Sequence, residues 1–139
     1  METMKSCPEC GAKEQNERDC YAQLTEVLGW EAHDPELQRA HFLTVASYNL
    51  QHPAKFTAEA IAGLRSSVAD YLDGKLTTAQ IRERNSRAYN GPKRLTKPAA
   101  ERVPVFKEWA MTIADVHAHN HPEGAAERVR MWAGSIIKP

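Results

Sequence analysis

The stretch DPELQRAHFLTVASYNLQHP, residues 34–53, decides the fold. Asp34 followed by Pro35 is typical of an N-cap and a first helical turn, and Pro53 prevents the helix from continuing past about His52. Apolar side chains occupy nearly every face of this helix: Leu37, Ala40, Phe42, Leu43, Val45, Ala46, Tyr48 and Leu50. A helix of this kind is surrounded by other elements. We therefore predict that it is the central element of a helical bundle.

Helical spacing of apolar residues recurs along the rest of the chain, and no segment shows the sustained period of two that is typical of strands. We expect further helices over about 19–29, 57–73 and 77–90, with caps at Thr57 and Thr77, and a last helix opened by Pro122. Segment 105–116 fits a short helix, an extended arm, or both in succession. The predicted fold is all-α: a compact bundle of five or six helices in a single domain over residues 1–139, with a long basic connection over 91–104.

Charge is balanced over the whole chain but not along it. Lys plus Arg and Asp plus Glu both number 18, so no net field attracts nucleic acid or a membrane. Residues 8–36 are mainly acidic and residues 82–107 mainly basic. No run approaches the roughly 20 apolar residues that span a bilayer, and Met1 to Ser6 resembles neither a signal peptide nor an anchor. We expect a cytoplasmic protein, in which cysteines stay reduced.

The three cysteines predict a metal site near the N-terminus. Cys7-Pro8-Glu9-Cys10-Gly11 has the C-x-x-C-Gly pattern of a zinc knuckle, in which two thiolates converge and glycine permits an unusual backbone angle. Cys20 follows at the expected start of a helix, where the helix dipole favours a thiolate. We predict that residues 1–19 form a cysteine knuckle segment that zinc holds on the helical body. A redox C-x-x-C pair and incidental thiols are the alternatives.

Three sulfurs need one more ligand to close a tetrahedral site, and the central helix offers His41 and His52. The two lie too far apart along one helix to share an ion. If the first two helices form a hairpin, we expect Cys20 to lie level with the early part of the second, which favours His41. A knuckle that bends back favours His52 instead. The predicted ligands are therefore Cys7, Cys10, Cys20 and His41, with His52 as the alternative to His41.

A second group of histidines lies at His117, His119 and His121. His117 and His121 are spaced to chelate an ion from one helical face. However, Asn120-His121-Pro122 is typical of the entry to a helix. We expect these imidazoles to cap the helix, to be satisfied by neighbours or to face solvent.

The chain resembles an uncharacterised bacterial family, domain of unknown function 5946, through three features: CPECGA at residues 7–12, Cys20, and HFLTVASYNLQHP at residues 41–53. The resemblance continues through segments 63–65, 112–116 and 128–133. No activity is established for that family, so the resemblance implies no reaction. It does imply that certain residues are motif positions: Cys7, Cys10, Cys20, His41 and His52.

Three functions remain open. The first is a metal-stapled helical module that binds a protein partner or another copy of itself, and it fits best because sulfur-rich zinc sites are usually closed and structural. The second is a metal-dependent hydrolase or thiol transferase that uses His41 or His52 beside an open metal position, although no H-E-x-x-H motif is present. The third is nucleic-acid binding through residues 82–107, where Tyr89, Phe106 and Trp109 lie among basic residues; the neutral net charge weighs against it.

Overall fold

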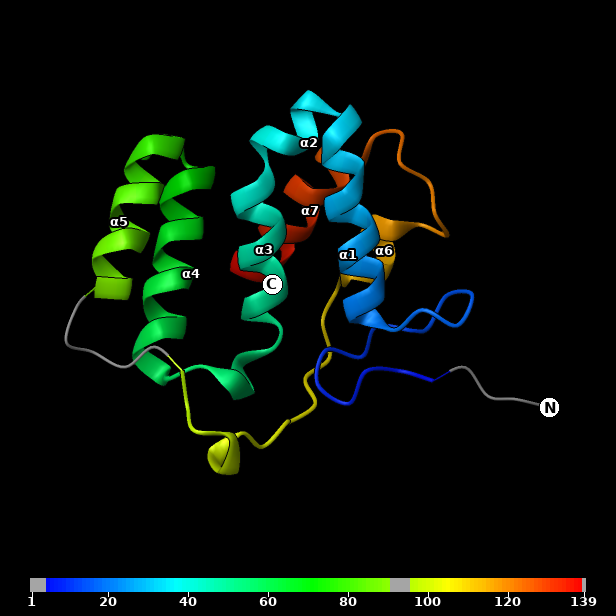
Figure 1. Cartoon of the computed structure of the whole chain (residues 1–139), viewed down its shortest axis with the longest axis horizontal. Helices are drawn as coiled ribbons and strands as arrows, with labels where there is room; N and C mark the ends of the chain where they lie inside the picture. The colour runs from blue at the N-terminus through cyan, green and yellow to red at the C-terminus, as the bar shows by residue number, and fades with distance from the viewer. Residues whose placement is uncertain (1–4, 91–95, 139) are drawn as a thin grey trace.

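The computed structural model describes residues 5–90 and 96–138 (Figure 1). Within these ranges the chain forms α-helices and short 3₁₀ helices, and no strand. The α-helices are α1 (Cys20–Trp30), α2 (Pro35–Arg39), α3 (His41–Leu50), α4 (Ala58–Leu72), α5 (Thr78–Asn90), α6 (Ile113–His117) and α7 (Ala125–Ile137). The 3₁₀ helices are η1 (Glu31–His33), η2 (Pro53–Lys55) and η3 (Ala99–Glu101). The prediction of an all-α fold is confirmed.

Two of the predicted helix starts are visible as side-chain caps. Thr57 Oγ1 accepts a hydrogen bond from the Ala60 amide at 3.2 Å, at the start of α4. At the start of α5, Thr77 Oγ1 accepts from the Gln80 amide at 3.2 Å, and Gln80 Oε1 accepts from the Thr77 amide at 2.8 Å. Each cap satisfies backbone donors that a helix leaves free in its first turn.

The continuous helix expected over residues 34–52 is wrong, because the structure divides it in two. Asp34 caps α2 as expected, accepting from the Leu37 amide at 3.1 Å. The chain then turns at Ala40, where ψ is 8°, and α3 begins at His41. No glycine or proline marks this turn. It follows from packing: α2 lies against α7 and buries Leu37 completely, so tertiary contacts override the local helix preference.

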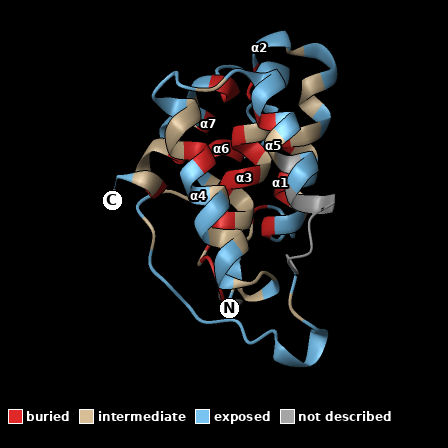
Figure 2. Ribbon diagram, turned by 90° about the vertical axis from the view of Figure 1, so that its left-hand side faces the viewer, coloured by how far each residue is buried: buried red, intermediate tan, exposed pale blue. Residues whose placement is uncertain are grey.

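Helices α1 and α3 lie side by side and run in opposite directions, joined by η1 and α2 (Figure 1). The first residue of α1 is therefore level with the last residues of α3. Helix α7 packs against α3, α4 and α6, and its Trp132 is fully buried. The Trp132 indole donates to Gln51 Oε1 at 3.1 Å. Buried positions concentrate where α3, α6 and α7 meet (Figure 2).

Helices α4 and α5 form a hairpin beside this centre (Figure 1). Ile81 is the buried anchor of α5, with 2% of its surface exposed. Arg84 donates to Ser67 Oγ at 3.1 Å and lies 3.5 Å from Asp70 Oδ2. Most of α5 is polar, so α5 is attached through one side only.

An extended segment, residues 102–109, passes along one end of the bundle from α5 towards α6 (Figure 1). We call it the arm. It is fixed before its start, where Lys97 donates its amide to Lys55 O at 2.9 Å, and near its end, where Lys107 donates to Glu9 O at 3.2 Å. Residues 91–95, the first part of the connection expected over 91–104, lie outside the described residues.

Segment 105–116, which the sequence left open, is extended and then helical, with α6 beginning at Ile113. Pro122 does not open the last helix. Helix α7 begins at Ala125, after Gly124, whose φ of 76° sets the turn. None of the described helices is long and apolar enough to cross a membrane.

Candidate metal centre

Residues 5–15, which we call the hairpin, fold back on themselves around the C-x-x-C pair. Cys7 donates its amide to Ala12 O at 3.0 Å, and Gly11 donates to Cys7 O at 3.0 Å. Gly11 has a φ of +78°, in the left-handed region, which confirms the need for glycine there. A Cβ at this position would lie 2.8 Å from the Phe106 ring, so the arm covers the turn closely.

Backbone amides of this hairpin point at its sulfurs. The amides of Glu9 and Cys10 each lie 3.4 Å from Cys7 Sγ, and the amide of Ala12 lies 3.4 Å from Cys10 Sγ. Amides directed at sulfur favour its negatively charged form. The hairpin is therefore shaped to hold two thiolates.

Cys20 and His52 complete the group from two other parts of the chain. Cys20 is the first residue of α1, after the cap Asp19, and His52 lies just past the end of α3. Because α1 and α3 are antiparallel, these two positions meet. His52 Nε2 lies 3.5 Å from Cys20 Sγ and 3.6 Å from Cys7 Sγ.

The four donor atoms of Cys7, Cys10, Cys20 and His52 all lie within 4.8 Å of one another, and none of the sulfurs forms a disulfide. A tetrahedral zinc ion with sulfur at about 2.3 Å and nitrogen at about 2.0–2.1 Å places a sulfur and a nitrogen about 3.6 Å apart. The distances from His52 to the two sulfurs match this value. Three thiols and one imidazole are also the donors that a tetrahedral zinc site uses. The group could thus bind a metal ion.

Tyr48 orients the histidine and contacts a sulfur. Its carbonyl lies 2.6 Å from His52 Nδ1, so Nδ1 donates there and Nε2 is left free to face the sulfurs. The two rings stack with centroids 4.0 Å apart, and the Tyr48 hydroxyl lies 3.5 Å from Cys20 Sγ. Tyr48 precedes His52 by one helical turn, and this spacing could have shown that the two share a face.

Glu9 joins the hairpin to the segment that carries His52. Its carboxylate accepts from the Ala54 amide at 2.8 Å, in η2, and its backbone carbonyl accepts from Lys107 in the arm. Only 9% of the Glu9 surface is exposed. Sequence reasoning missed this role, because the spacing between residue 9 and residue 54 carries no signal of their contact.

Crowding shifts the pKa values of these groups. A hydrogen bond with Cys10, supported by contacts with His52 and Tyr48, lowers the pKa of Cys20 to about 4 despite burial. The same bond, together with burial, raises the pKa of Cys10. Burial alone would lower the pKa of His52, but its hydrogen bonds to Cys20 and to the Tyr48 carbonyl raise it to about 9. Cys20 is therefore the more acidic of these two thiols.

The structure does not bring His41 to the sulfurs. His41 lies at the other end of α3, largely exposed, with Nδ1 2.9 Å from Glu31 Oε1. His41 would be the nearer histidine only if Cys20 lay level with the early part of the second helix. In an antiparallel pair the start of one helix meets the end of the other, and α2 shifts this register further because α3 begins only at residue 41.

His117, His119 and His121 do not form a group. His117 is buried in α6, with Nδ1 2.7 Å from Gln15 Oε1 and Nε2 3.0 Å from Glu26 Oε1. His121 lies 3.6 Å from Glu123 at the surface, and His119 is exposed. Both ring nitrogens of His117 thus have partners within the protein, which makes its role structural.

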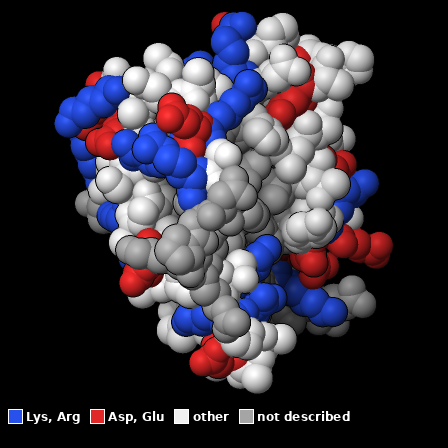
Figure 3. Space-filling model, turned by 60° about the vertical axis from the view of Figure 1, so that its left-hand side comes forward, with Lys and Arg blue, Asp and Glu red and all other residues white. Residues whose placement is uncertain are grey.

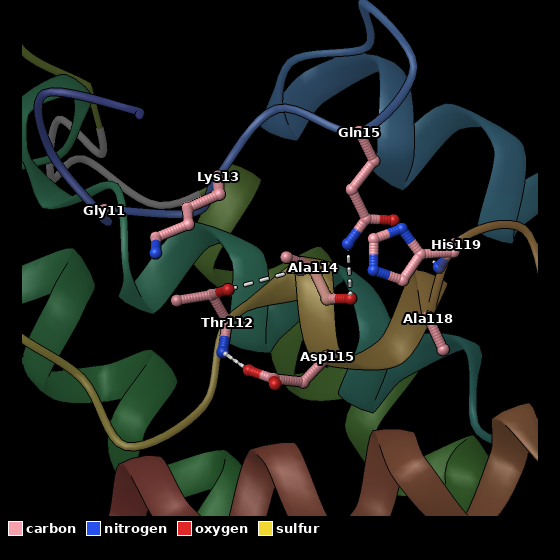
Figure 4. A pocket seen from close by; sticks show the side chains of 8 residues that line it. All are labelled: Gly11, Lys13, Gln15, Thr112, Ala114, Asp115, Ala118 and His119. Carbon is pink, nitrogen blue, oxygen red and sulfur yellow. Dashed lines mark hydrogen bonds between the residues drawn. The ribbon is translucent and has the colours of Figure 1, made fainter. Parts of the chain in front are cut away.

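A pocket of about 430 Å³ lies between the hairpin and α6 (Figure 4). Thr112 and Asp115 line it, but they form the capping box of α6, and the Gln15 amide donates to Ala114 O at 3.0 Å. The remaining charged group, Lys13, is exposed. The polar groups of this pocket mainly hold the hairpin against α6.

Comparison with known proteins gives one match. The model of a family of unknown function, DUF5946, matches residues 5–139. The chain belongs to DUF5946. No curated protein and no solved structure matches it. The DUF5946 match covers both the hairpin and the helices that carry Cys20 and His52, so the family extends over every part of the site.

Proposed function

We propose that Cys7, Cys10, Cys20 and His52 bind one zinc ion, and that this ion fixes residues 5–19 to the helical body of an accessory or protein-interaction module. The observation that carries the proposal is the convergence of four donors from three separate parts of the chain at distances suited to a tetrahedral ion.

The donor set favours zinc over other metals. Thiolates and imidazole together suit zinc, whereas calcium and magnesium prefer oxygen ligands. The carboxylate nearest in sequence, that of Glu9, is already bound to the Ala54 amide. The amides that point at Cys7 and Cys10 and the carbonyl that orients His52 are the outer contacts that such a site needs.

The number of donors favours a structural role over catalysis. A catalytic zinc keeps one position for water or substrate, while four protein ligands close a tetrahedron. Residues 5–19 also have a clear need for the ion. Their buried apolar residues are small, Cys10 and Ala12, so burial contributes little to holding the segment.

Elemental analysis of the purified chain tests the proposal. We expect about one zinc per chain in the unmodified protein and little in the Cys20→Ser variant, because a serine hydroxyl is a poor ligand for a sulfur-rich site. The Tyr21→Ser variant changes an exposed neighbour, 66% accessible, and serves as a control that should keep its zinc. A Cys20→Ser protein with unchanged zinc content would refute the ligand assignment.

A further inference from the structure

The arm carries an unusual concentration of exposed apolar surface. Val103, Val105 and Phe106 expose 68%, 71% and 60% of their surfaces. Because residues 102–109 are extended, Val103 and Val105 lie on the same side of the arm. Apolar groups gathered in this way mark interaction sites more often than scattered ones do.

The arm also has free backbone groups. The chain is tied to Lys55 by Lys97, before the arm begins, and to Glu9 by Lys107. The Lys107 amide is the one backbone group of residues 103–110 with a backbone partner in the part of the chain that the structure describes. A row of unpaired amides and carbonyls can pair with an added strand. Pro104 removes one donor from this row, which limits pairing to a short segment.

Basic residues lie in the arm and in the chain before it. Arg102 and Lys107 belong to the arm, Lys97 precedes it by five residues, and Lys55 is bonded to Lys97 through the backbone. None of the four has a carboxylate within 4.0 Å among the described residues. Figure 3 shows Lys and Arg side chains at the lower end of the molecule, where the arm runs, with Asp and Glu side chains beside them. Two acidic residues lie in the same stretch, Glu108 in the arm and Glu101 directly before it, so the basic residues outnumber the acidic ones by four to two. An acidic ligand would therefore be complementary to this surface.

We propose that the arm docks an extended segment of a partner protein in which acidic residues alternate with apolar ones. The apolar residues of that segment would cover Val103 and Val105, and its acidic residues would face Lys97, Arg102 and Lys107. This inference rests on the proposed function as an interaction module and names the chemistry of its partner.

The aromatic residues of the arm argue against nucleic acid as the ligand. The Phe106 ring lies against Gly11, and Lys107 Nζ lies 4.2 Å from the centroid of the Trp109 ring. The Lys107 ammonium thus covers one face of the Trp109 ring, while single-stranded nucleic acid binds by stacking on free aromatic faces. The two most exposed apolar residues, Val103 and Val105, are valines, which suit an aliphatic partner, and Phe106 is the one exposed side chain of the arm that is typical of membrane anchors.

Fluorescence anisotropy with labelled peptide pools tests the proposal on the zinc-loaded full chain. The first pool consists of 12-residue peptides that alternate Asp or Glu with Val, Leu or Phe, and the second has Lys or Arg in place of the acids. We expect the acidic pool to bind at least tenfold more tightly than the basic pool. A Val103→Asp/Val105→Asp variant should bind the acidic pool at least tenfold more weakly than the unmodified chain. Met131→Asp changes an exposed apolar residue of α7 and should bind the pool as tightly as the unmodified chain does.

Four results would overturn the proposal. The chain could fail to bind the acidic pool, or it could bind both pools equally well. The double variant could bind the acidic pool as tightly as the unmodified chain does, or the chain could bind a 20-residue oligothymidine or vesicles rich in phosphatidylserine more tightly than the acidic pool. Zinc content is measured on the same samples. A chain that holds zinc but fails these tests would refute the docking proposal alone, and a chain without zinc would refute the proposed function.

Discussion

At the scale of single residues, His52 shows how the protein prepares a ligand. The Tyr48 carbonyl occupies Nδ1, the Tyr48 ring stacks on the imidazole, and Nε2 is left facing two sulfurs. The residue types of the site could be read from the sequence, since C-x-x-C-Gly, a third cysteine and two candidate histidines were all visible. The choice between His41 and His52 depended on which ends of two helices meet, and that is a property of the packed fold.

Replacing the two candidate histidines in turn separates their roles. We expect His52→Ala to lose most of its zinc, because three sulfurs alone leave the tetrahedron open, and His41→Ala to keep about one ion per chain. Zinc is measured after dialysis against a weak chelator. Loss of zinc in His41→Ala with retention in His52→Ala would contradict the account.

Gly11 gives a second test at this scale. Gly11→Ala should reduce the free energy of unfolding by about 1–2 kcal/mol, because alanine is strained at a left-handed φ. The added Cβ would also displace the Phe106 ring, which is exposed and able to move.

Gly63→Ala is the matched control. Gly63 lies in α4 with no atom near its Cβ position, so alanine there should raise stability by up to about 1 kcal/mol. Urea unfolding monitored by circular dichroism measures both variants. An equal effect of the two substitutions would show that the hairpin does not require glycine.

At the scale of elements, the positions and caps of most helices could be predicted because they depend on local residues such as Thr57 and Thr77. The turn at Ala40 could not, since it arises from the packing of α2 on α7. The contacts of the arm were equally hidden. Gln51 is the clearest case for the segment between the arm and α6. Its amide donates to Met111 O at 2.7 Å and accepts from the Trp132 indole, so it links the end of α3, α7 and this segment.

Replacing Gln51 should reduce the free energy of unfolding. Gln51→Leu leaves the Trp132 N–H and the Met111 carbonyl without their partner in a buried site, and we expect a loss of about 2–4 kcal/mol in the free energy of unfolding. Gln38→Leu, at an exposed position of α2, should change stability by less than about 0.5 kcal/mol. Thermal unfolding measures the melting temperatures of the two variants. Similar melting temperatures for Gln51→Leu and Gln38→Leu would exclude a linking role for Gln51.

At the scale of the whole molecule, the helical body and the N-terminal hairpin differ in what stabilises them. The body has a continuous apolar core around Trp132, to which the hairpin adds only the small residues Cys10 and Ala12. Hydrogen bonds of Glu9 and Gln15 hold the hairpin, and we propose that an ion at the four donors completes its attachment. The all-α class could be predicted from the periodicity of apolar residues. The proximity of His52, and not His41, to Cys7 and Cys20 depends on the complete fold.

Metal removal should therefore affect one part of the molecule first. With excess chelator we expect hydrogen exchange to rise strongly in residues 5–19, 52–56 and 105–109, and much less in α7, whose core residues remain buried. Uniform loss of protection would indicate that the ion supports the whole core equally.

X-ray absorption at the zinc edge tests the central claim most directly, because it reports the ligand atoms of the bound ion. The account predicts three sulfur atoms at about 2.3 Å and one nitrogen at about 2.0–2.1 Å from zinc, with no water. A first shell of oxygen and nitrogen atoms, or a fourth ligand from solvent, would contradict the closed Cys7, Cys10, Cys20 and His52 site.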